Sequence, residues 1–187
     1  MKPFSNLFFS IIPILFGFAT WSSSNPNLNP INSTCAISSR DDPNIDYAFC
    51  VTSLQAVPGS RCASLGALGK ISIDLVLRNI TETSCYIEQL IENGTWDPYR
   101  RQCLSDCSEL FSDAIPAVEQ AARDYEARRF DDANVHISSA MDAATTCEDG
   151  FNERSGRNSP MTKRNNDAFQ LSAIVLAIID LVRARSS

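Results

Sequence analysis

The sequence predicts an all-α protein: an up-and-down four-helix bundle preceded by a helical hairpin and stapled by disulfides. Three observations favour this class. Apolar residues recur every three or four positions over four long segments. Proline, glycine and asparagine fall between those segments, where helices end. No segment alternates apolar and polar residues as a half-buried strand would. Short connections between the segments make successive helices antiparallel neighbours.

The start of the chain is predicted to be a secretory signal peptide, residues 1–24, so that the folded domain spans residues 25–187. Lys2 supplies a positive charge, residues 7–19 form an apolar run, and residues 22–24 are small enough for cleavage. The apolar run is shorter than a membrane span needs. We therefore expect a secreted protein without membrane attachment after cleavage.

Cysteines and glycosylation sequons agree with export. All 7 cysteines follow the predicted signal, which favours disulfides in an oxidising compartment. N-glycosylation sequons begin at Asn32, Asn79 and Asn93. The sequence thus predicts a disulfide-bonded glycoprotein.

Residues 35–60 are predicted to form the helical hairpin, closed by a bridge between Cys35 and Cys50. Proline and glycine interrupt the short apolar stretches of this segment. The bridge would close a loop of 15 residues, which contributes about 3 kcal/mol on the loop-entropy model.

Four longer helices follow. The first is expected over residues 61–93, the second over 97–128 and the third over 131–152. Ser159 and Pro160 favour the start of the last helix as N-cap and first residue. The expected inward stripes are Leu65, Leu68, Ser72, Leu75, Asn79 and Glu82; Cys107, Phe111, Ala114, Val118, Ala121 and Tyr125; Ala133, Ile137, Ala140, Met141, Ala144 and Cys147; and Leu171, Ile174, Val175, Ile178, Leu181 and Val182.

Turn symmetry predicts a second disulfide, Cys107–Cys147. Residues equally far from the turn lie level in an antiparallel helix pair, and the midpoint of this pair is residue 127, next to the predicted turn. A bridge from Cys103 to Cys147 agrees less well with this turn, because the midpoint of that pair is residue 125. The loop of 40 residues makes the bridge worth about 3–4 kcal/mol.

Three cysteines remain: Cys62, Cys85 and Cys103. The first two lie 23 residues apart on one predicted helix, about 35 Å, too far to pair. Cys85 could bridge Cys103, because their midpoint falls at the turn near residue 94. Cys62 would then be free or would link two molecules as a dimer. The alternative is that all three are unpaired, buried thiols.

The sequence offers no catalytic or metal-binding constellation, and we expect neither an enzyme nor a cofactor or metal. His136 is the single histidine, and Cys147 lies eleven residues further on, about 16 Å along a helix, too far for a nucleophile–base pair. No cysteine or histidine spacing matches a zinc site, and no glycine motif matches a phosphate loop. A net charge of -6 without a basic block argues against a nucleic-acid partner.

Several segments together resemble the plant invertase and pectin methylesterase inhibitor family. They are the two-cysteine hairpin, CSELFSDA at 107–114, SSAM at 138–141, TCED at 146–149, SPMTK at 159–163 and QLSAI at 170–174. The likeness is greatest to the branch with the plane-tree pollen allergen. The resemblance implies a four-helix bundle with a hairpin, the same two disulfides, and a protein inhibitor of the cell wall or vacuole. An acid invertase is the leading expected target, and pectin methylesterase is the alternative.

The resemblance also implies a target-binding segment at Arg128, Arg129 and Phe130. Invertase inhibitors carry a Pro-Lys-Phe motif near the turn between the second and third long helices; here a basic residue and the phenylalanine remain, but the proline is missing. Arg129 would pair with glycosidase carboxylates, and Phe130 would fill a sugar-sized pocket. Three alternatives stay open: an ordinary basic helix end, contact through the polar faces of the bundle, and a non-inhibitory interaction or carrier protein.

Overall fold

The computed structural model describes residues 29–153 and 158–186, which fold into helices without a strand. The predicted signal peptide lies outside these ranges. The all-α prediction is confirmed. The elements are α1 (Pro30–Asp41), α2 (Tyr47–Gln55), the 3-10 helix η1 (Ser60–Cys62), α3 (Leu65–Asn93), α4 (Pro98–Glu126), α5 (Phe130–Asn152) and α6 (Thr162–Ser186).

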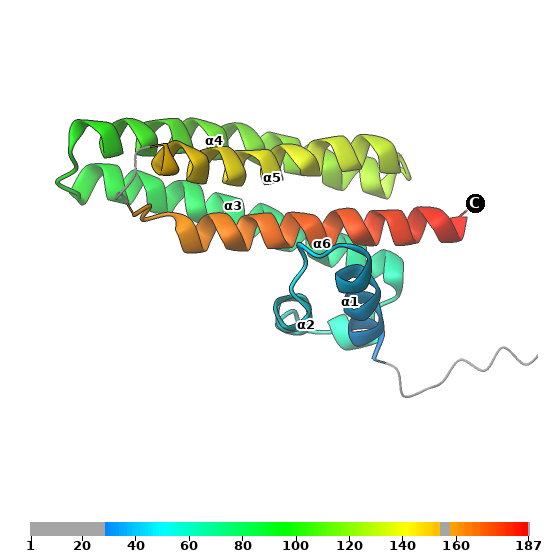
Figure 1. Ribbon diagram of the computed structural model, residues 1–187. Helices are drawn as coiled ribbons and strands as arrows, with labels where there is room; N and C mark the ends of the chain where they lie inside the picture. The colour runs from blue at the N-terminus through cyan, green and yellow to red at the C-terminus, as the bar shows by residue number, and fades with distance from the viewer. Residues whose placement is uncertain (1–28, 154–157, 187) are drawn as a thin grey trace, which may run out of the picture.

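Helices α3 to α6 form the up-and-down bundle (Figure 1). Each long helix packs against its neighbours in the chain, and α6 returns to pack against α3, which closes the bundle. The α1–α2 hairpin lies outside the bundle, against α3 and α6. The α3–α4 turn and the α4–α5 turn therefore lie at opposite ends of the molecule.

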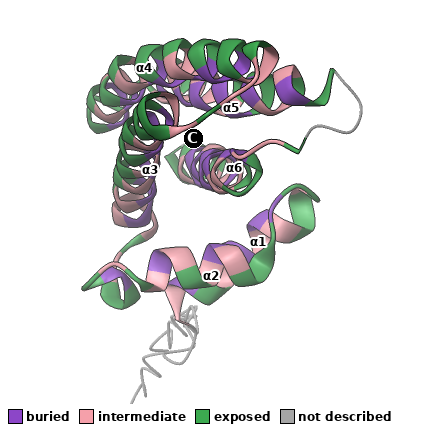
Figure 2. Ribbon diagram, turned by 90° about the vertical axis from the view of Figure 1, so that its left-hand side faces the viewer, coloured by how far each residue is buried: buried purple, intermediate pink, exposed green. Residues whose placement is uncertain are grey.

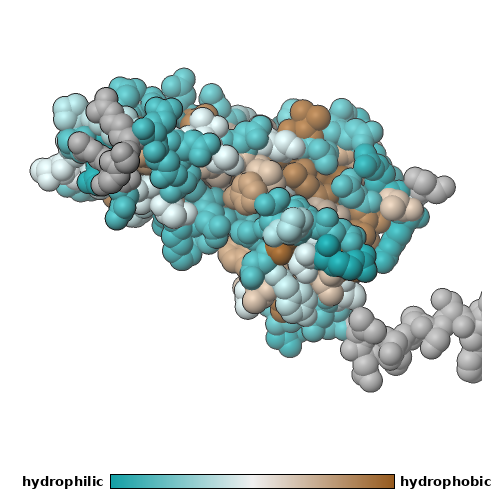
Figure 3. Space-filling model, viewed as in Figure 1, coloured by the Kyte–Doolittle hydropathy of each residue, from teal (hydrophilic) through white to brown (hydrophobic). Residues whose placement is uncertain are grey.

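Two apolar clusters hold the bundle and the hairpin together. Figure 2 marks the buried residues of each helix in purple. The larger cluster fills the bundle, with Phe111, Ile137 and Phe151 fully buried. The smaller cluster joins Ile31 and Leu54 of the hairpin to α3 and α6. Most of the face seen in Figure 3 is hydrophilic, with apolar side chains gathered over α5 and α6 above the hairpin.

Helix α3 differs from the prediction in its start and its inward face. It begins at Leu65 instead of residue 61, because Ser60–Cys62 forms a separate 3-10 turn and the Ser64 hydroxyl caps α3 by accepting from the Ala67 N–H at 3.2 Å. The predicted stripe is also rotated, since Glu82 is exposed and Asn79 is only half-buried. The residues that face the bundle core are Ile73, Val76, Ile80 and Ile87.

The other long helices keep their predicted faces with shifted ends. Helix α4 stops at Glu126 and α5 already starts at Phe130. Helix α6 starts at Thr162, two residues after Pro160, although the Ser159 hydroxyl still accepts from the Met161 N–H at 3.0 Å. Met141 is half-buried instead of buried.

Both predicted disulfides of the framework are present. Cys35 and Cys50 join α1 to α2 with Cα atoms 5.8 Å apart, and Cys107 and Cys147 join α4 to α5 with Cα atoms 4.9 Å apart. The second pair, which turn symmetry predicts, is therefore confirmed.

The suggested Cys85–Cys103 bridge is wrong, because both residues are free thiols. Cys85 is exposed on α3, whereas Cys103 is buried and its thiol donates to the Gly150 carbonyl of α5 at 3.4 Å. The two side chains therefore occupy different faces. Cys62 is also a free, exposed thiol, in η1.

Helices α3 and α4 approach closely at Gly69. The Tyr125 hydroxyl of α4 donates to the Gly66 carbonyl of α3 at 3.1 Å. A Cβ atom on Gly69 would overlap the hydroxyl oxygen and Cζ of Tyr125 and would lie 3.0 Å from Cε2. Glycine at 69 thus makes room for the tyrosine ring next to the α4–α5 turn.

Candidate functional site

The α4–α5 turn ends α4 in a Schellman motif. The Arg128 N–H donates to the Tyr125 carbonyl at 3.0 Å, and the Arg129 N–H donates to the Asp124 carbonyl at 2.8 Å. Arg128 has φ +59°, the left-handed conformation that this position requires and that glycine usually supplies. The turn therefore holds two arginines in one defined backbone geometry.

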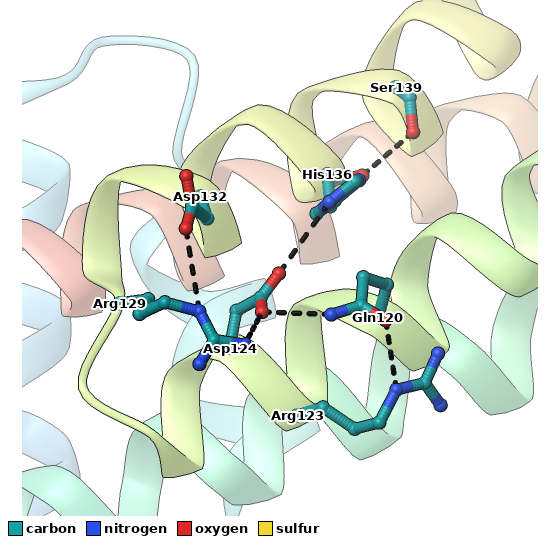
Figure 4. Close-up of polar contacts among 7 residues, drawn as sticks. All are labelled: Gln120, Arg123, Asp124, Arg129, Asp132, His136 and Ser139. Atoms are coloured by element: carbon teal, nitrogen blue, oxygen red, sulfur yellow. Dashed lines mark hydrogen bonds and ion pairs between the residues drawn. The ribbon is translucent and has the colours of Figure 1, made fainter.

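A buried carboxylate organises this turn from inside. Asp124 is 2% exposed and accepts hydrogen bonds from the guanidinium of Arg129 and, at 2.8 Å, from Nε2 of Gln120. Nε2 of His136 on α5 lies 3.5 Å from its other oxygen. Arg129 also reaches Asp132 at 3.4 Å, so its side chain lies between the two carboxylates (Figure 4).

Asp124 remains ionised in this setting. Burial raises its pKa, but the hydrogen bonds from Arg129 and Gln120 and the positive charge of Arg129 outweigh burial, so that the pKa lies below its ordinary value. The carboxylate therefore still holds Arg129 in place at mildly acidic pH.

Phe130 begins α5 and packs edge-on against Tyr125, with ring centroids 5.5 Å apart and planes at 66°. Burial raises the pKa of the Tyr125 phenol, which stays protonated and donates to α3. A surface depression opens beside the two rings. It is lined by Gly66, Lys70, Tyr125, Glu126, Arg128, Phe130, Val182 and Ser186.

The structure brings the three predicted target-binding residues to one end of the bundle but gives them different surroundings. Arg128 is exposed, Arg129 is held by carboxylates, and Phe130 is half-buried. His136, for which the sequence predicts no catalytic role, is half-buried and joins the Asp124 cluster. Asp124 is not among the residues that the sequence predicts for this site, although it lies three residues after the stripe residue Ala121, a spacing that places both on one face of α4.

The TCED segment at residues 146–149 has a structural role near the C-terminal end of α5. Cys147 forms the disulfide to α4. Glu148 accepts from the Thr162 hydroxyl at 2.6 Å and from the Asn165 amide at 2.8 Å, which anchors the first turn of α6. The segment therefore stabilises the fold and lies away from the α4–α5 turn.

The three sequons differ in accessibility. Asn32 is exposed on α1, and its side chain lies 3.4 Å from the amide of Gln55. Asn79 is half-buried in the middle of α3, with its side-chain oxygen buried. Asn93 is exposed as the last residue of α3. Asn93 is thus the sequon placed at a turn.

None of the helices within residues 29–153 and 158–186 has the length and apolar character needed to cross a bilayer. Within the same ranges, histidine, cysteine and acidic side chains form no group of three able to hold a metal ion.

The helical bundle, its hairpin and its two disulfides place the chain in a known class: it belongs to the plant invertase/pectin methylesterase inhibitor family, whose model matches residues 29–178. Members of this family inhibit enzymes, and this protein is not an enzyme itself.

Among individual relatives, the chain is 40% identical to the protein named "Putative invertase inhibitor" of Platanus orientalis over 154 residues, 82% of this chain and 90% of that one. It is 26% identical to the cell wall/vacuolar inhibitor of fructosidase 2 of Arabidopsis thaliana, over 94% of this chain and 96% of the relative. The pectinesterase inhibitor of Actinidia deliciosa is 29% identical, over 95% of this chain and 94% of the relative.

A solved structure shares the fold. The crystal structure of mutant form A of a pectin methylesterase inhibitor from Arabidopsis superposes with a TM-score of 0.68 at 23% identity, covering 80% of this chain and 96% of the other. The likeness extends over nearly all of that protein and concerns the fold alone.

Proposed function

We propose that this protein is a secreted inhibitor of a plant acid invertase and that it covers the active site of the enzyme with the α4–α5 end of the bundle. The observation that carries the proposal is the rigid cationic turn at Arg128 and Arg129, braced by buried Asp124. The 40% identity to the Platanus protein named as an invertase inhibitor supports invertase over pectin methylesterase.

The chemistry of the target suits this turn. Glycosidases place two carboxyl groups around the bond they cleave, and guanidinium groups form short, charge-assisted hydrogen bonds with carboxylates. Because the Schellman hydrogen bonds and the Asp124 cluster hold the turn in advance, docking loses little ordering entropy. Phe130 adds a half-buried aromatic edge beside the cations.

Export and glycosylation fit an inhibitor of the cell wall, with the vacuole as the other destination. The exposed sequon at Asn93 ends α3, at the opposite end of the bundle from Arg129. A glycan there would leave the proposed contact surface open. A dimer through the exposed thiol of Cys62 stays a prediction.

Pectin methylesterase is the second candidate target. The 29% identity to the Actinidia pectinesterase inhibitor covers 95% of this chain, almost its whole length. In that case the polar faces of the long helices would cover the pectin-binding cleft, and the α4–α5 turn would matter less.

A titration distinguishes these targets. The oxidised, secreted protein is added to one acid invertase and to one pectin methylesterase at mildly acidic pH. Loss of invertase activity alone is the expected result. Loss of methylesterase activity alone would move the contact to the bundle faces, and no loss with either enzyme would refute inhibition of these targets.

Variants of the turn test the contact surface in the same assay. Replacing Arg129 and Phe130 together by alanine is expected to abolish inhibition of invertase. Arg101→Ala is the matched control, because Arg101 is exposed near the start of α4, at the far end of the bundle. An unchanged inhibition constant for the double variant would refute the placement of the contact.

A further inference from the structure

We infer that Arg128 is the specificity-determining cation of this surface, recognising a carboxylate of the target protein, and that Arg129 is a positioning residue that holds the turn. This inference rests on the proposed function. It assigns different roles to the two neighbouring arginines. The resemblance alone favours Arg129 as the recognising cation, because Arg129 precedes Phe130 as the lysine precedes the phenylalanine in the Pro-Lys-Phe motif.

Arg129 is already engaged inside the protein. Its guanidinium binds Asp124, whose side chain is 3% exposed, and reaches Asp132 at 3.4 Å. Turning this side chain toward a target would leave the buried carboxylate without its cation, and an uncompensated buried charge is strongly unfavourable. Arg129 therefore stays where it is when the surface is covered.

The other charges around the turn are largely matched. Lys70 pairs with Glu126 at 2.5 Å, and Arg183 pairs with Asp131 at 2.5 Å. No carboxylate in the described part of the chain forms an ion pair with Arg128, which is exposed. Its charge is therefore available to a partner.

The backbone conformation of Arg128 supports the same assignment. Its φ of +59° is a conformation in which a side chain is disfavoured and glycine is not. The turn would be more stable with glycine at this C′ position. An arginine kept at a strained, exposed position is the pattern found at functional sites.

The surroundings of Arg128 indicate what it binds. It lines the depression whose apolar part is formed by Tyr125, Phe130 and Val182. A guanidinium beside such a surface suits an aspartate or glutamate that stands next to apolar or sugar-binding groups, since the planar guanidinium can bind both carboxylate oxygens. The partner is thus an acidic side chain at the rim of the target's sugar site.

The experiment compares Arg128→Gly with the wild type, in inhibition and in stability. Arg128→Gly is expected to raise the unfolding midpoint, because the strain is removed, and to raise the inhibition constant about 10- to 100-fold, the equivalent of one charge-assisted hydrogen-bonded pair. The variant should also lose most of the salt dependence of inhibition, since the lost contact is electrostatic.

Two further variants separate recognition from general charge and from positioning. Arg185→Ala removes an exposed positive charge from the last turn of α6, at the same end of the bundle, and should leave the inhibition constant within about twofold. Arg129→Gln removes the positive charge that Asp124 binds, so it should lower the unfolding midpoint but keep the salt dependence of inhibition.

The outcomes are distinguishable. If the wild type inhibits invertase and Arg128→Gly inhibits equally well, the assignment of Arg128 is overturned while the proposed function stands. If Arg129→Gln loses the salt dependence and Arg128→Gly keeps it, the roles of the two arginines are reversed. If the wild type itself inhibits neither enzyme, the proposed function fails and the assignment fails with it.

Discussion

Replacing Gly69 by alanine is expected to separate α3 from α4 next to the α4–α5 turn. The new Cβ would overlap the hydroxyl end of the Tyr125 ring, which is 6% exposed and cannot swing into solvent without leaving the core. Gly66 offers a matched control on the same helix, because a Cβ at that position meets nothing within 4 Å.

The magnitude follows from three contributions. Overpacking of a core contact costs about 1–3 kcal/mol, and loss of the Tyr125 hydrogen bond to the Gly66 carbonyl costs about 0.5–1.5 kcal/mol. Alanine has a higher helix propensity than glycine, which stabilises the helix by up to about 1 kcal/mol. Gly69→Ala should therefore lower the free energy of unfolding by about 0.5–4.5 kcal/mol, whereas Gly66→Ala should raise it by up to about 1 kcal/mol.

Thermal unfolding followed by circular dichroism measures the difference. The helix-propensity gain is common to both alanine variants, so they should differ by about 1.5–4.5 kcal/mol. One kcal/mol shifts the midpoint by about 2–4 °C in a domain of this size, which makes the difference roughly 3–18 °C. Adding Tyr125→Phe to Gly69→Ala should cost less than the sum of the two single changes, because the hydroxyl that overlaps most is gone. A Gly69→Ala protein as stable as Gly66→Ala would refute the close approach.

Three more predictions concern the bridge, the buried acid and the glycan. Replacing Cys107 and Cys147 together by serine should lower the free energy of unfolding by about 4 kcal/mol, measured by urea unfolding, because the bridge closes a loop of 40 residues. Asp124→Asn should lower the unfolding midpoint between pH 5 and 7. The difference from the wild type should begin to shrink below about pH 4, where the carboxyl of the unfolded chain takes up its proton, and should disappear once the folded-state carboxyl, whose pKa is lower, is protonated too. Asn93→Gln should remove a glycan from the secreted protein, seen as a loss of mass equal to that released by a glycosidase specific for N-linked sugars.

Each of these has a result that contradicts it. A bridge-free protein with unchanged urea midpoint would mean that the reduced chain keeps the same contacts. An Asp124→Asn difference that grows as the pH falls would mean that the carboxylate is destabilising when charged. An Asn93→Gln protein of unchanged glycan mass would place the sugar at another sequon.

Helix number, the order of packing and both framework disulfides could be predicted from the sequence, because periodicity and turn symmetry depend on spacing alone. The inward face of α3 could not. Leu68 packs toward the hairpin and Leu75 contacts both clusters, whereas Ile73 and Val76 pack toward the bundle core. A helix with apolar residues on two adjacent faces has no single stripe, so spacing cannot decide which face meets α4 and α6.

The site was predictable as a set of residue types but not as a geometry. The two arginines and Phe130 are visible at a predicted turn. The capture of Arg129 by Asp124 depends on a hydrogen-bonded helix end, and the left-handed conformation of Arg128 is one that arginine seldom adopts. Neither follows from composition or period.

The buried thiol of Cys103 has a consequence for how the correct bridge survives in an oxidising compartment. Cys103 is a free thiol that lines the same groove as Cys107 and Cys147, and a thiol beside a disulfide is a possible partner for exchange. Burial raises its pKa, and only the thiolate attacks a disulfide. The thiol also donates a hydrogen bond to the Gly150 carbonyl of α5 at 3.4 Å. Packing around Cys103 therefore favours its thiol form, which does not attack the native cross-link.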